Sequence, residues 1–177
     1  AMAAARQLDQ LVIDAAVGNA YEGKDGATVT ALPAVQSIAA GGTFDTSKLR
    51  LAKKKFDQDK VPKMNRICLI NAAMEDTLLA DSLFVNADSN NKKPLVQGDV
   101  AFWLGFRLVS LELLPNSNLD AICLGWRGIG AGIHKDVGTR VDQIPVKHYS
   151  WQILTNMKLG ATRVEDKQVI RLTDAAT

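Results

Sequence analysis

Apolar residues near the start of the chain recur at the spacing of a helix. Four of them fall on one helical face: Leu8, Leu11, Val12 and Ala15. This spacing predicts a first helix of about four turns. The segment 27–42 contains Pro33 and a Gly-Gly pair, so we predict a poorly structured connection there with one short strand at most.

A second helix is predicted to begin after Asp45, a residue type that caps helix starts well. Phe44 and Leu49 are spaced to pack against each other across this start, as in a hydrophobic staple. Val61-Pro62 is expected to end the helix, because proline cannot continue one.

A buried strand at 67–70 and a third helix capped by Asn71 are predicted next, followed by a polar loop at 86–94. The rest of the chain has the pattern of strands. Turn and loop residues, including the 136–147 stretch and Gly160, divide it into five predicted strands: 106–114, 119–126, 129–135, 149–159 and 167–173. Helices followed by mostly antiparallel strands indicate the α+β fold class.

The composition is that of one soluble domain or of two small subdomains. The chain has 177 residues, 47% of them apolar, and its 21 Lys and Arg residues nearly balance its 19 Asp and Glu residues. This excludes disordered, collagen-like and disulfide-rich proteins. We expect no membrane span, because no stretch reaches the roughly 18 continuous apolar residues that one needs. We expect no export signal, because residues 1–20 lack a basic leader before an apolar run. Cys68 and Cys123 lie in apolar runs and are expected to be buried, reduced thiols.

Positive charge is concentrated in the segment 48–66. It holds two acidic residues and eight basic ones: Lys48, Arg50, Lys53, Lys54, Lys55, Lys60, Lys63 and Arg66. Such a segment can contact nucleic-acid phosphates. Because no interleaved aromatic residues are available for base stacking, a solvated helix face that includes Lys53 to Lys55 is the preferred interpretation.

No motif predicts catalysis. A glycine-rich run follows the second predicted strand: Gly125, Gly128, Gly130 and Gly132. Its spacing matches neither a dinucleotide fingerprint nor a phosphate loop, so we predict a hairpin with tight turns. His134 and His148 are the two histidines, and they lie outside zinc-binding patterns. We therefore predict no enzyme activity, no catalytic or cofactor-binding residues, no cofactor and no metal site.

Three tryptophans, Trp103, Trp126 and Trp151, lie in apolar segments. Tryptophans in such segments are commonly core residues or subunit contacts. A chain with many strand edges, three tryptophans and no convergent polar motif is typical of a protein that buries its surface in an assembly.

Five short segments follow one another in a characteristic order: Ala5-Arg6-Gln7-Leu8-Asp9, Leu95-Val96-Gln97-Gly98 running to Leu104-Gly105-Phe106, Leu114-Pro115, Trp126-Arg127-Gly128-Ile129 and Gly160-Ala161-Thr162-Arg163-Val164-Glu165. This ordered set resembles major capsid proteins of tailed bacteriophages, which have the Hong Kong 97-type fold. The resemblance runs from about Ala5 to Leu172 and is most specific over 147–165.

The resemblance implies a Hong Kong 97-like fold, with a peripheral domain that carries a long helix and sheet and an axial domain at the capsomer centre. Residues 5–44 and 131–177 would form the discontinuous peripheral domain, and 45–130 the axial domain. Family members carry an N-terminal arm and an extended loop before the first helix, which do not precede Ala5 in this sequence. We therefore expect a fragment that is a monomer or a small oligomer by itself.

The resemblance also implies a function. We expect a structural subunit of a bacteriophage or prophage icosahedral capsid that self-assembles into pentamers and hexamers and encloses the genome. Non-specific contact with packaged DNA is compatible with this role, and contact with a membrane is not expected. The expected location is the virion capsid, after synthesis in the bacterial host cytoplasm. Two alternatives remain, an encapsulin-like bacterial shell protein and a nucleic-acid-binding domain that uses the segment 48–66.

Overall fold

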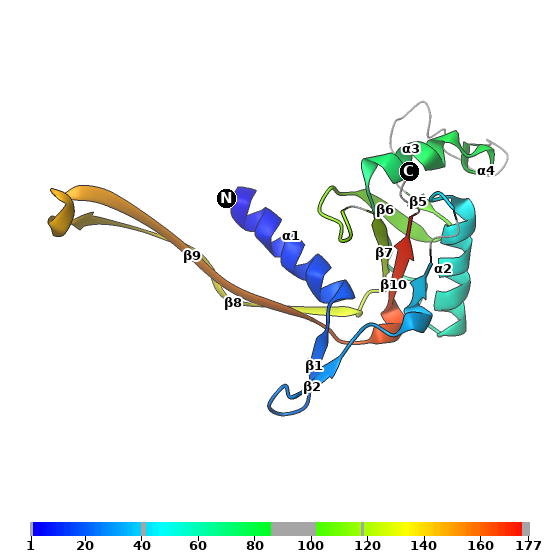
Figure 1. The fold of residues 1–177 in the computed structure, drawn as a ribbon, viewed down its shortest axis with the longest axis horizontal. Coiled ribbons are helices and arrows are strands. Elements are labelled where there is room, and N and C mark those ends of the chain that lie inside the picture. The colour runs from blue at the N-terminus through cyan, green and yellow to red at the C-terminus, as the bar shows by residue number, and fades with distance from the viewer. Residues whose placement is uncertain (1, 40–41, 86–101, 118, 175–177) are drawn as a thin grey trace.

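Strands from distant parts of the chain form one mixed sheet in the body of the molecule (Figure 1). The structure is a computed structural model, and it describes residues 2–39, 42–85, 102–117 and 119–174. The strands lie in the order β3-β10-β7-β4-β6-β5. Their bounds are β3 (Ser37–Ile38), β4 (Arg66–Ile70), β5 (Phe102–Trp103), β6 (Phe106–Ser110), β7 (Asp120–Leu124) and β10 (Val169–Thr173).

Both parallel and antiparallel pairs occur in this sheet. β10 is parallel to β3 and antiparallel to β7. β4 is antiparallel to β7 and parallel to β6, and β5 is antiparallel to β6. Because helices cover the sheet and antiparallel pairs predominate, the structure agrees with the predicted α+β class.

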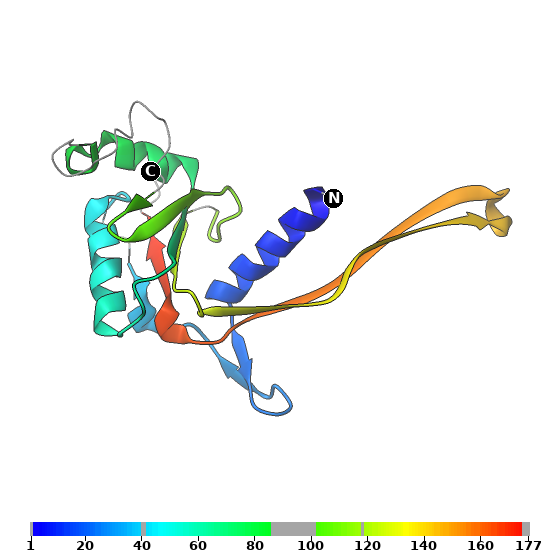
Figure 2. The same ribbon diagram turned by 180° about the vertical axis from the view of Figure 1, so that it is seen from behind.

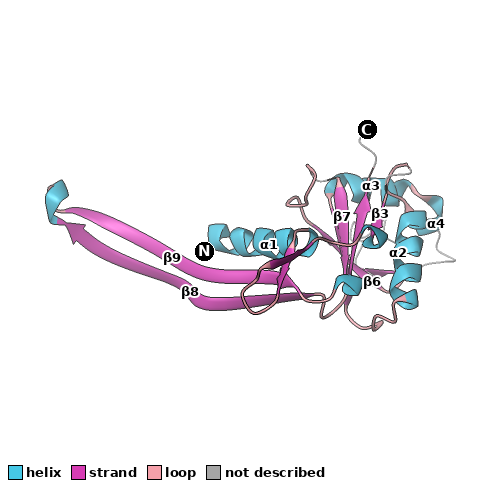
Figure 3. Cartoon of the chain, turned by 60° about the horizontal axis from the view of Figure 1, so that its bottom comes forward, coloured by secondary structure: helices cyan, strands magenta, loops and turns pink. Residues whose placement is uncertain are grey.

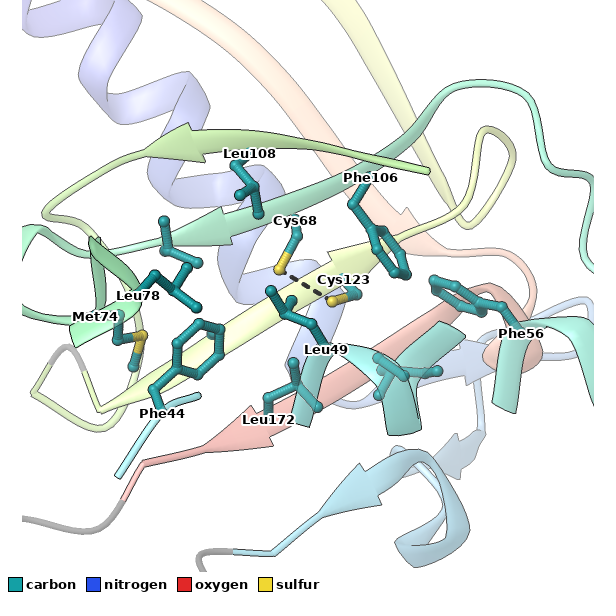
Figure 4. Close-up of a cluster of buried hydrophobic side chains, with 14 of the residues drawn as sticks. Phe44, Leu49, Phe56, Cys68, Met74, Leu78, Phe106, Leu108, Cys123 and Leu172 are labelled. Carbon is teal, nitrogen blue, oxygen red and sulfur yellow. Dashed lines mark hydrogen bonds between the residues drawn. The ribbon is translucent and has the colours of Figure 1, made fainter. Parts of the chain in front are cut away.

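Two helices, α2 (Thr46–Gln58) and α3 (Ala72–Ala80), cover one face of the sheet and bury the main core. Figure 4 shows side chains of this core, which include Phe44, Leu49, Phe56, Cys68, Met74, Leu78, Phe106, Leu108, Cys123 and Leu172. The short helix α4 (Ser82–Val85) adds Phe84, whose ring centroid lies 4.7 Å from that of Trp103. Alternate residues of each strand point to this face, so the period-two pattern of the sequence builds the core.

The predicted first helix is confirmed as α1 (Met2–Val17), which lies on the other face of the sheet. Ile13 and Ala16, near its C-terminal end, pack in a second, smaller core with Leu114, Ile122 and Val169. The N-terminal part of α1 extends beyond the sheet (Figures 1 and 3). The helix is therefore anchored to the body at one end only.

The predicted helix caps at Asp45 and Asn71 are confirmed. The Asp45 carboxylate accepts a hydrogen bond from the Lys48 amide at 3.1 Å, and the Asn71 side-chain oxygen accepts one from the Met74 amide at 2.7 Å. Each interaction satisfies a backbone donor that the first helical turn cannot pair internally.

The end of α2 lies at Gln58, earlier than Val61-Pro62, where the sequence predicts it. Lys60 adopts the left-handed conformation with φ 58°. The Val61 amide then donates to the Phe56 carbonyl at 2.9 Å, which closes the helix in a Schellman-type turn. The proline follows a helix that this turn has already ended.

Cys68 of β4 and Cys123 of β7 are paired across the sheet, and their sulfur atoms lie 3.0 Å apart in a hydrogen bond (Figure 4). Both are free and buried, as predicted. Burial raises the pKa of the Cys123 thiol well above its ordinary value, and the hydrogen bond with Cys68 adds to this shift. The pair therefore serves as neutral, apolar core.

Two long strands, β8 (Ile129–Ile144) and β9 (Ser150–Arg163), form a separate antiparallel ribbon that projects from the body (Figures 1 and 2). The register pairs Ile129 with Arg163 at the root of the ribbon and Ile144 with Ser150 near its tip. The tip is a turn that contains the 3-10 helix η2 (Pro145–Lys147) and two left-handed residues, His148 and Tyr149.

The loop predicted at 136–147 is wrong up to Ile144, because β8 continues to that residue, and is confirmed for 145–147, which lie in the turn at the tip. The register shifts between Ile133 and Gly138, where β8 holds more residues than the facing part of β9. Such bulges accommodate extra residues and bend a strand without ending it. The strand break predicted at Gly160 is also wrong, since this residue lies inside β9 opposite Gly132.

The connection after α1 is more ordered than the sequence predicts. β1 (Ala20–Glu22) and β2 (Thr28–Thr30) form a short hairpin, and the 3-10 helix η1 (Ala34–Gln36) leads into β3. β6 ends at Ser110, before the predicted end at residue 114, and Leu114 instead packs in the smaller core.

The sheet draws strands from all three predicted domain segments. β3 lies in 5–44 and β10 in 131–177, whereas the other four strands lie in 45–130.

The polar loop predicted at 86–94 lies outside the described residues.

Leu49 and Leu51 provide a matched test of the helix α2 interface, since Leu49 is fully buried and Leu51 is 49% exposed. We predict that Leu49→Ala lowers the free energy of unfolding by about 2–5 kcal/mol, because it removes core contacts and leaves a cavity. Leu51→Ala is expected to change it by about 0.5 kcal/mol or less. Urea denaturation followed by circular dichroism measures both values, and equal losses would contradict the orientation of α2.

Candidate assembly surfaces on the ribbon

The β8–β9 ribbon is the feature that the body of the molecule covers least. Its strands hold 16 and 14 residues. It extends roughly 50 Å, since antiparallel strands rise about 3.4 Å per residue. Helix α1 packs against part of it, and the β1–β2 hairpin packs near its root (Figure 3). Two-stranded sheets are marginally stable in water unless something packs on them.

The two faces of β9 differ in polarity, because successive strand residues point to opposite faces. One face, here called the apolar face, carries Trp151, Ile153, Thr155, Met157, Leu159, Ala161 and Arg163. The other face carries Ser150, Gln152, Leu154, Asn156, Lys158, Gly160 and Thr162. This alternation is typical of a strand with one buried and one solvated face.

Helix α1 covers the inner half of the apolar face. A shallow groove of about 280 Å³ lies between the helix and the ribbon. Its apolar lining comes from both elements: Ala4, Ala5, Leu8, Ile133, Val137, Met157 and Leu159. The inner half of the ribbon therefore has a layer packed on it within the same chain.

The outer half of the apolar face is uncovered and is here called the outer patch. It consists of three cross-strand pairs: Thr139 with Thr155, Val141 with Ile153, and Gln143 with Trp151. Val141, Ile153 and Trp151 are 53%, 70% and 69% exposed. The six residues carry no charge, whereas the opposite face at this level holds Arg140 and Asp142, paired at 2.6 Å. The outer patch can therefore meet another surface without burying a charge.

The glycine-rich run carries the chain from the sheet to the ribbon. The hairpin predicted here is wrong, because β7 and β8 belong to different sheets. The Gly125 amide donates to the Gln168 carbonyl at 2.7 Å, and the Val164 amide donates to the Gly128 carbonyl at 2.9 Å. A Cβ atom on Gly128 would lie 3.0 Å from the Gln168 carbonyl oxygen, so glycine permits a close crossing of two chain segments.

Two residues of the basic segment 48–66, Lys48 and Arg66, are buried. The interpretation of this segment as a solvated helix face is therefore wrong for these two residues. Lys48 donates to the carbonyls of Gly42 at 2.5 Å and Thr173 at 3.0 Å. Arg66 is 2% exposed and pairs with Asp57 at 2.8 Å. Both cations stabilise the body, and neither can reach a phosphate.

The lysines at the centre of the segment lie partly in solvent. Lys54 is exposed, and Lys53 and Lys55 are half-buried on α2. Lys55 also pairs with Asp59 at 3.5 Å. The positive surface that remains for a ligand is therefore smaller than the sequence indicates.

The two histidines lie at different places on the ribbon. His134 is exposed on β8, and His148 is exposed in the turn at the ribbon tip. Within the part of the chain that the structure describes, no three His, Cys, Asp or Glu residues are grouped so that they could hold a metal ion. None of the helices in that part has the length and apolarity needed to cross a membrane.

The tryptophans divide between core and surface. Trp103 is partly buried against the main core, as the sequence indicates. Trp126 and Trp151 are 56% and 69% exposed in the single chain, so they are not core residues here. The Arg127 guanidinium lies 4.9 Å from the Trp126 ring centroid.

The outer patch is the surface that sequence reasoning misses, because a loop is predicted over half of it. Val137, Thr139 and Val141 alternate with polar residues, which is the signal of a half-buried strand. The matching alternation from Trp151 onward completes the pattern on β9.

A comparison with protein-family models matches residues 1–175 to the family described as phage capsid protein. A comparison with curated protein sequences found no match.

Solved capsid structures are similar to this structure over nearly its whole length. A structure from Mycobacterium phage Che8 has a TM-score of 0.75 at 17% identity, over 97% of this chain and 59% of that one. The capsid of cyanophage P-SCSP1u has a TM-score of 0.72 at 16% identity, over 99% of this chain and 63% of that one. An encapsulin complex from Synechococcus elongatus PCC 7942 has a TM-score of 0.54 at 10% identity, over 97% and 61%.

These similarities confirm the Hong Kong 97-like capsid fold expected from the sequence. The chain spans about three fifths of the length of the structures that it matches.

Ile153 and Leu154 are neighbours on opposite faces of β9, and Ile153 lies in the outer patch. We predict that copies of the chain associate through the outer patch, and that Ile153→Thr weakens this association about fivefold by removing about 1 kcal/mol of apolar burial. Leu154→Thr is expected to change it less than about twofold. Sedimentation velocity over a range of protein concentrations measures the effect. A wild-type chain that shows no concentration dependence, or equal effects of the two variants, would contradict this use of the outer patch.

Proposed function

This chain belongs to the phage capsid protein family, and we propose that it is a structural subunit of a bacteriophage or prophage icosahedral capsid. The observation that carries the proposal is the projecting ribbon, whose outer patch is uncharged, exposes Val141, Ile153 and Trp151, and is left uncovered by the described part of the chain. Exposed apolar surface of this kind marks interaction sites. In a shell, neighbouring copies of the subunit cover it.

In this role the subunits self-assemble into pentamers and hexamers that together enclose the genome. Helix α1 and the ribbon form the peripheral part, and the six-stranded sheet with α2 and α3 forms the axial part. This division modifies the one expected from the sequence by moving β3 and β10 into the axial part. The support for the change is that both strands pair within the sheet of the body.

The proposed role is structural, without enzyme activity. His134 and His148 lie on the ribbon, well separated in the sequence and both exposed to solvent, and this placement favours a surface role over a catalytic one. The subunit is made in the cytoplasm of the bacterial host and resides in the capsid of the virion.

Particles that contain this chain are expected to enclose DNA. The test is to purify particles from the infected or induced host on a density gradient and to identify the chain in them by mass spectrometry. A capsid gives nuclease-resistant DNA in the fraction that holds the chain. Particles that hold protein cargo and lack DNA would overturn the capsid assignment and favour the second candidate, an encapsulin-like shell, which the shared fold supports.

A nucleic-acid-binding domain that uses the segment 48–66 makes a different prediction. We expect that replacing Lys53, Lys54 and Lys55 by alanine leaves the affinity for a labelled DNA duplex unchanged within about twofold. Fluorescence anisotropy at about 50 and 200 mM salt measures this, since phosphate contacts give a steep salt dependence. Tight, salt-sensitive binding that the triple variant abolishes would favour the nucleic-acid-binding function.

A further inference from the structure

Arg163, the last residue of β9, is a buried cation at the root of the ribbon, with a side chain that is 0% exposed. Its guanidinium donates to three carbonyl oxygens, those of Ala16 at 3.3 Å, Gly18 at 2.5 Å and Thr30 at 3.0 Å. Its Nε atom donates to the Asp166 carboxylate at 2.5 Å, so the buried charge has a counter-ion.

These acceptors lie at the ends of three different elements. Ala16 and Gly18 present carbonyls at the C-terminal end of α1, where helix carbonyls lack internal partners and carry partial negative charge. Thr30 is the last residue of β2. Asp166 is the first residue of the 3-10 helix η3 (Asp166–Gln168), which leads from the ribbon to β10. One planar side chain therefore joins the ribbon root, the first helix, the hairpin and the return to the sheet.

The other contacts between α1 and the ribbon fix their relative direction less strictly. In the groove described above, most of the lining residues are apolar, among them Leu8 and Leu159, with Asp136 at one position, and apolar burial is non-directional. Hydrogen bonds from a guanidinium require a definite distance and angle to each acceptor. The ribbon is joined to the body by further hydrogen bonds that do not involve the Arg163 side chain, from the Val164 amide to the Gly128 carbonyl and from the Gly125 amide to the Gln168 carbonyl.

We propose that Arg163 is a positioning residue that fixes the direction of α1 and of the β1–β2 hairpin relative to the ribbon. If the chain is a shell subunit, as proposed above, this joint sets the angle at which the helix and the outer patch meet neighbouring copies. The joint itself is a property of the single chain and can be measured without assembly.

Two spin-label pairs test the joint in the full chain by pulsed electron paramagnetic resonance. Cysteines introduced by Gln7→Cys on α1 and Gln152→Cys on the polar face of β9 report the distance between helix and ribbon. Lys54→Cys on α2 with Gln152→Cys reports the distance between body and ribbon. All three positions are exposed, whereas Cys68 and Cys123 are buried and remain unlabelled.

Arg163→Lys keeps the charge but lacks the planar fork. It is expected to broaden the helix-to-ribbon distance distribution at least about twofold, because the motion of α1 relative to the ribbon is then less restricted. The body-to-ribbon distribution should keep its width. Arg140→Gln is the matched control, since Arg140 is an exposed ribbon arginine that pairs only within the ribbon in the described structure. It should change neither distribution.

A purely stabilising role of Arg163 would lower the unfolding midpoint and leave the folded-state distributions narrow, and that result would overturn the proposal. If Arg163→Lys does not fold, Asp166→Asn provides the second test, because it keeps the guanidinium but removes its counter-ion and should broaden the same distribution. A broadened distribution in a chain that never enters DNA-containing particles would retain the joint and reject the capsid function. DNA-containing particles that hold the chain, together with an unchanged helix-to-ribbon distribution in Arg163→Lys, would retain the capsid function and reject the joint.

Discussion

A two-stranded ribbon cannot cover its own faces, and this constraint governs the rest of the structure. The apolar face of β9 continues for the whole strand, but α1 covers only its inner half. The outer patch is left with Val141, Trp151 and Ile153 in solvent. Water strongly favours covering such a surface. The described part of the chain therefore leaves apolar surface in solvent, which is what the proposed role in a shell requires.

The body of the molecule holds the root of the long β8–β9 ribbon. Its sheet is buried on both faces, by α2 and α3 on one side and by the end of α1 on the other. At the ribbon root, Gly128 permits the close chain crossing and Arg163 joins the surrounding elements by directional hydrogen bonds. A ribbon held in this way projects its outer patch at a defined angle, which a closed shell of repeated contacts depends on.

Local signals predicted the elements of the body well and the ribbon poorly. The caps at Asp45 and Asn71 and the buried strand after Arg66 follow from nearest-neighbour chemistry, so the sequence indicates them directly. The alternation of Val137, Thr139 and Val141 with polar residues is a local signal for the outer part of β8, but the bulge between Ile133 and Gly138 interrupts it, and the pairing of β8 with β9 is not visible in the local sequence. The burial of Lys48 and Arg66 likewise depends on distant carbonyls and carboxylates, and a count of charges along the chain overlooks it.

The outer patch is small, and its size has a consequence for assembly. Val141 and Ile153 are already partly covered in the single chain, at 53% and 70% exposed, so burying each yields less than the roughly 1.5–3 kcal/mol of a fully exposed side chain, while association costs about 4–15 kcal/mol in lost freedom of motion. A single contact through the outer patch is therefore weak and reversible. When one subunit makes several such contacts at once, each further contact forms at a high effective concentration, and the shell becomes stable although every contact in it is weak. Reversible contacts also let a misplaced subunit leave before the shell closes around it.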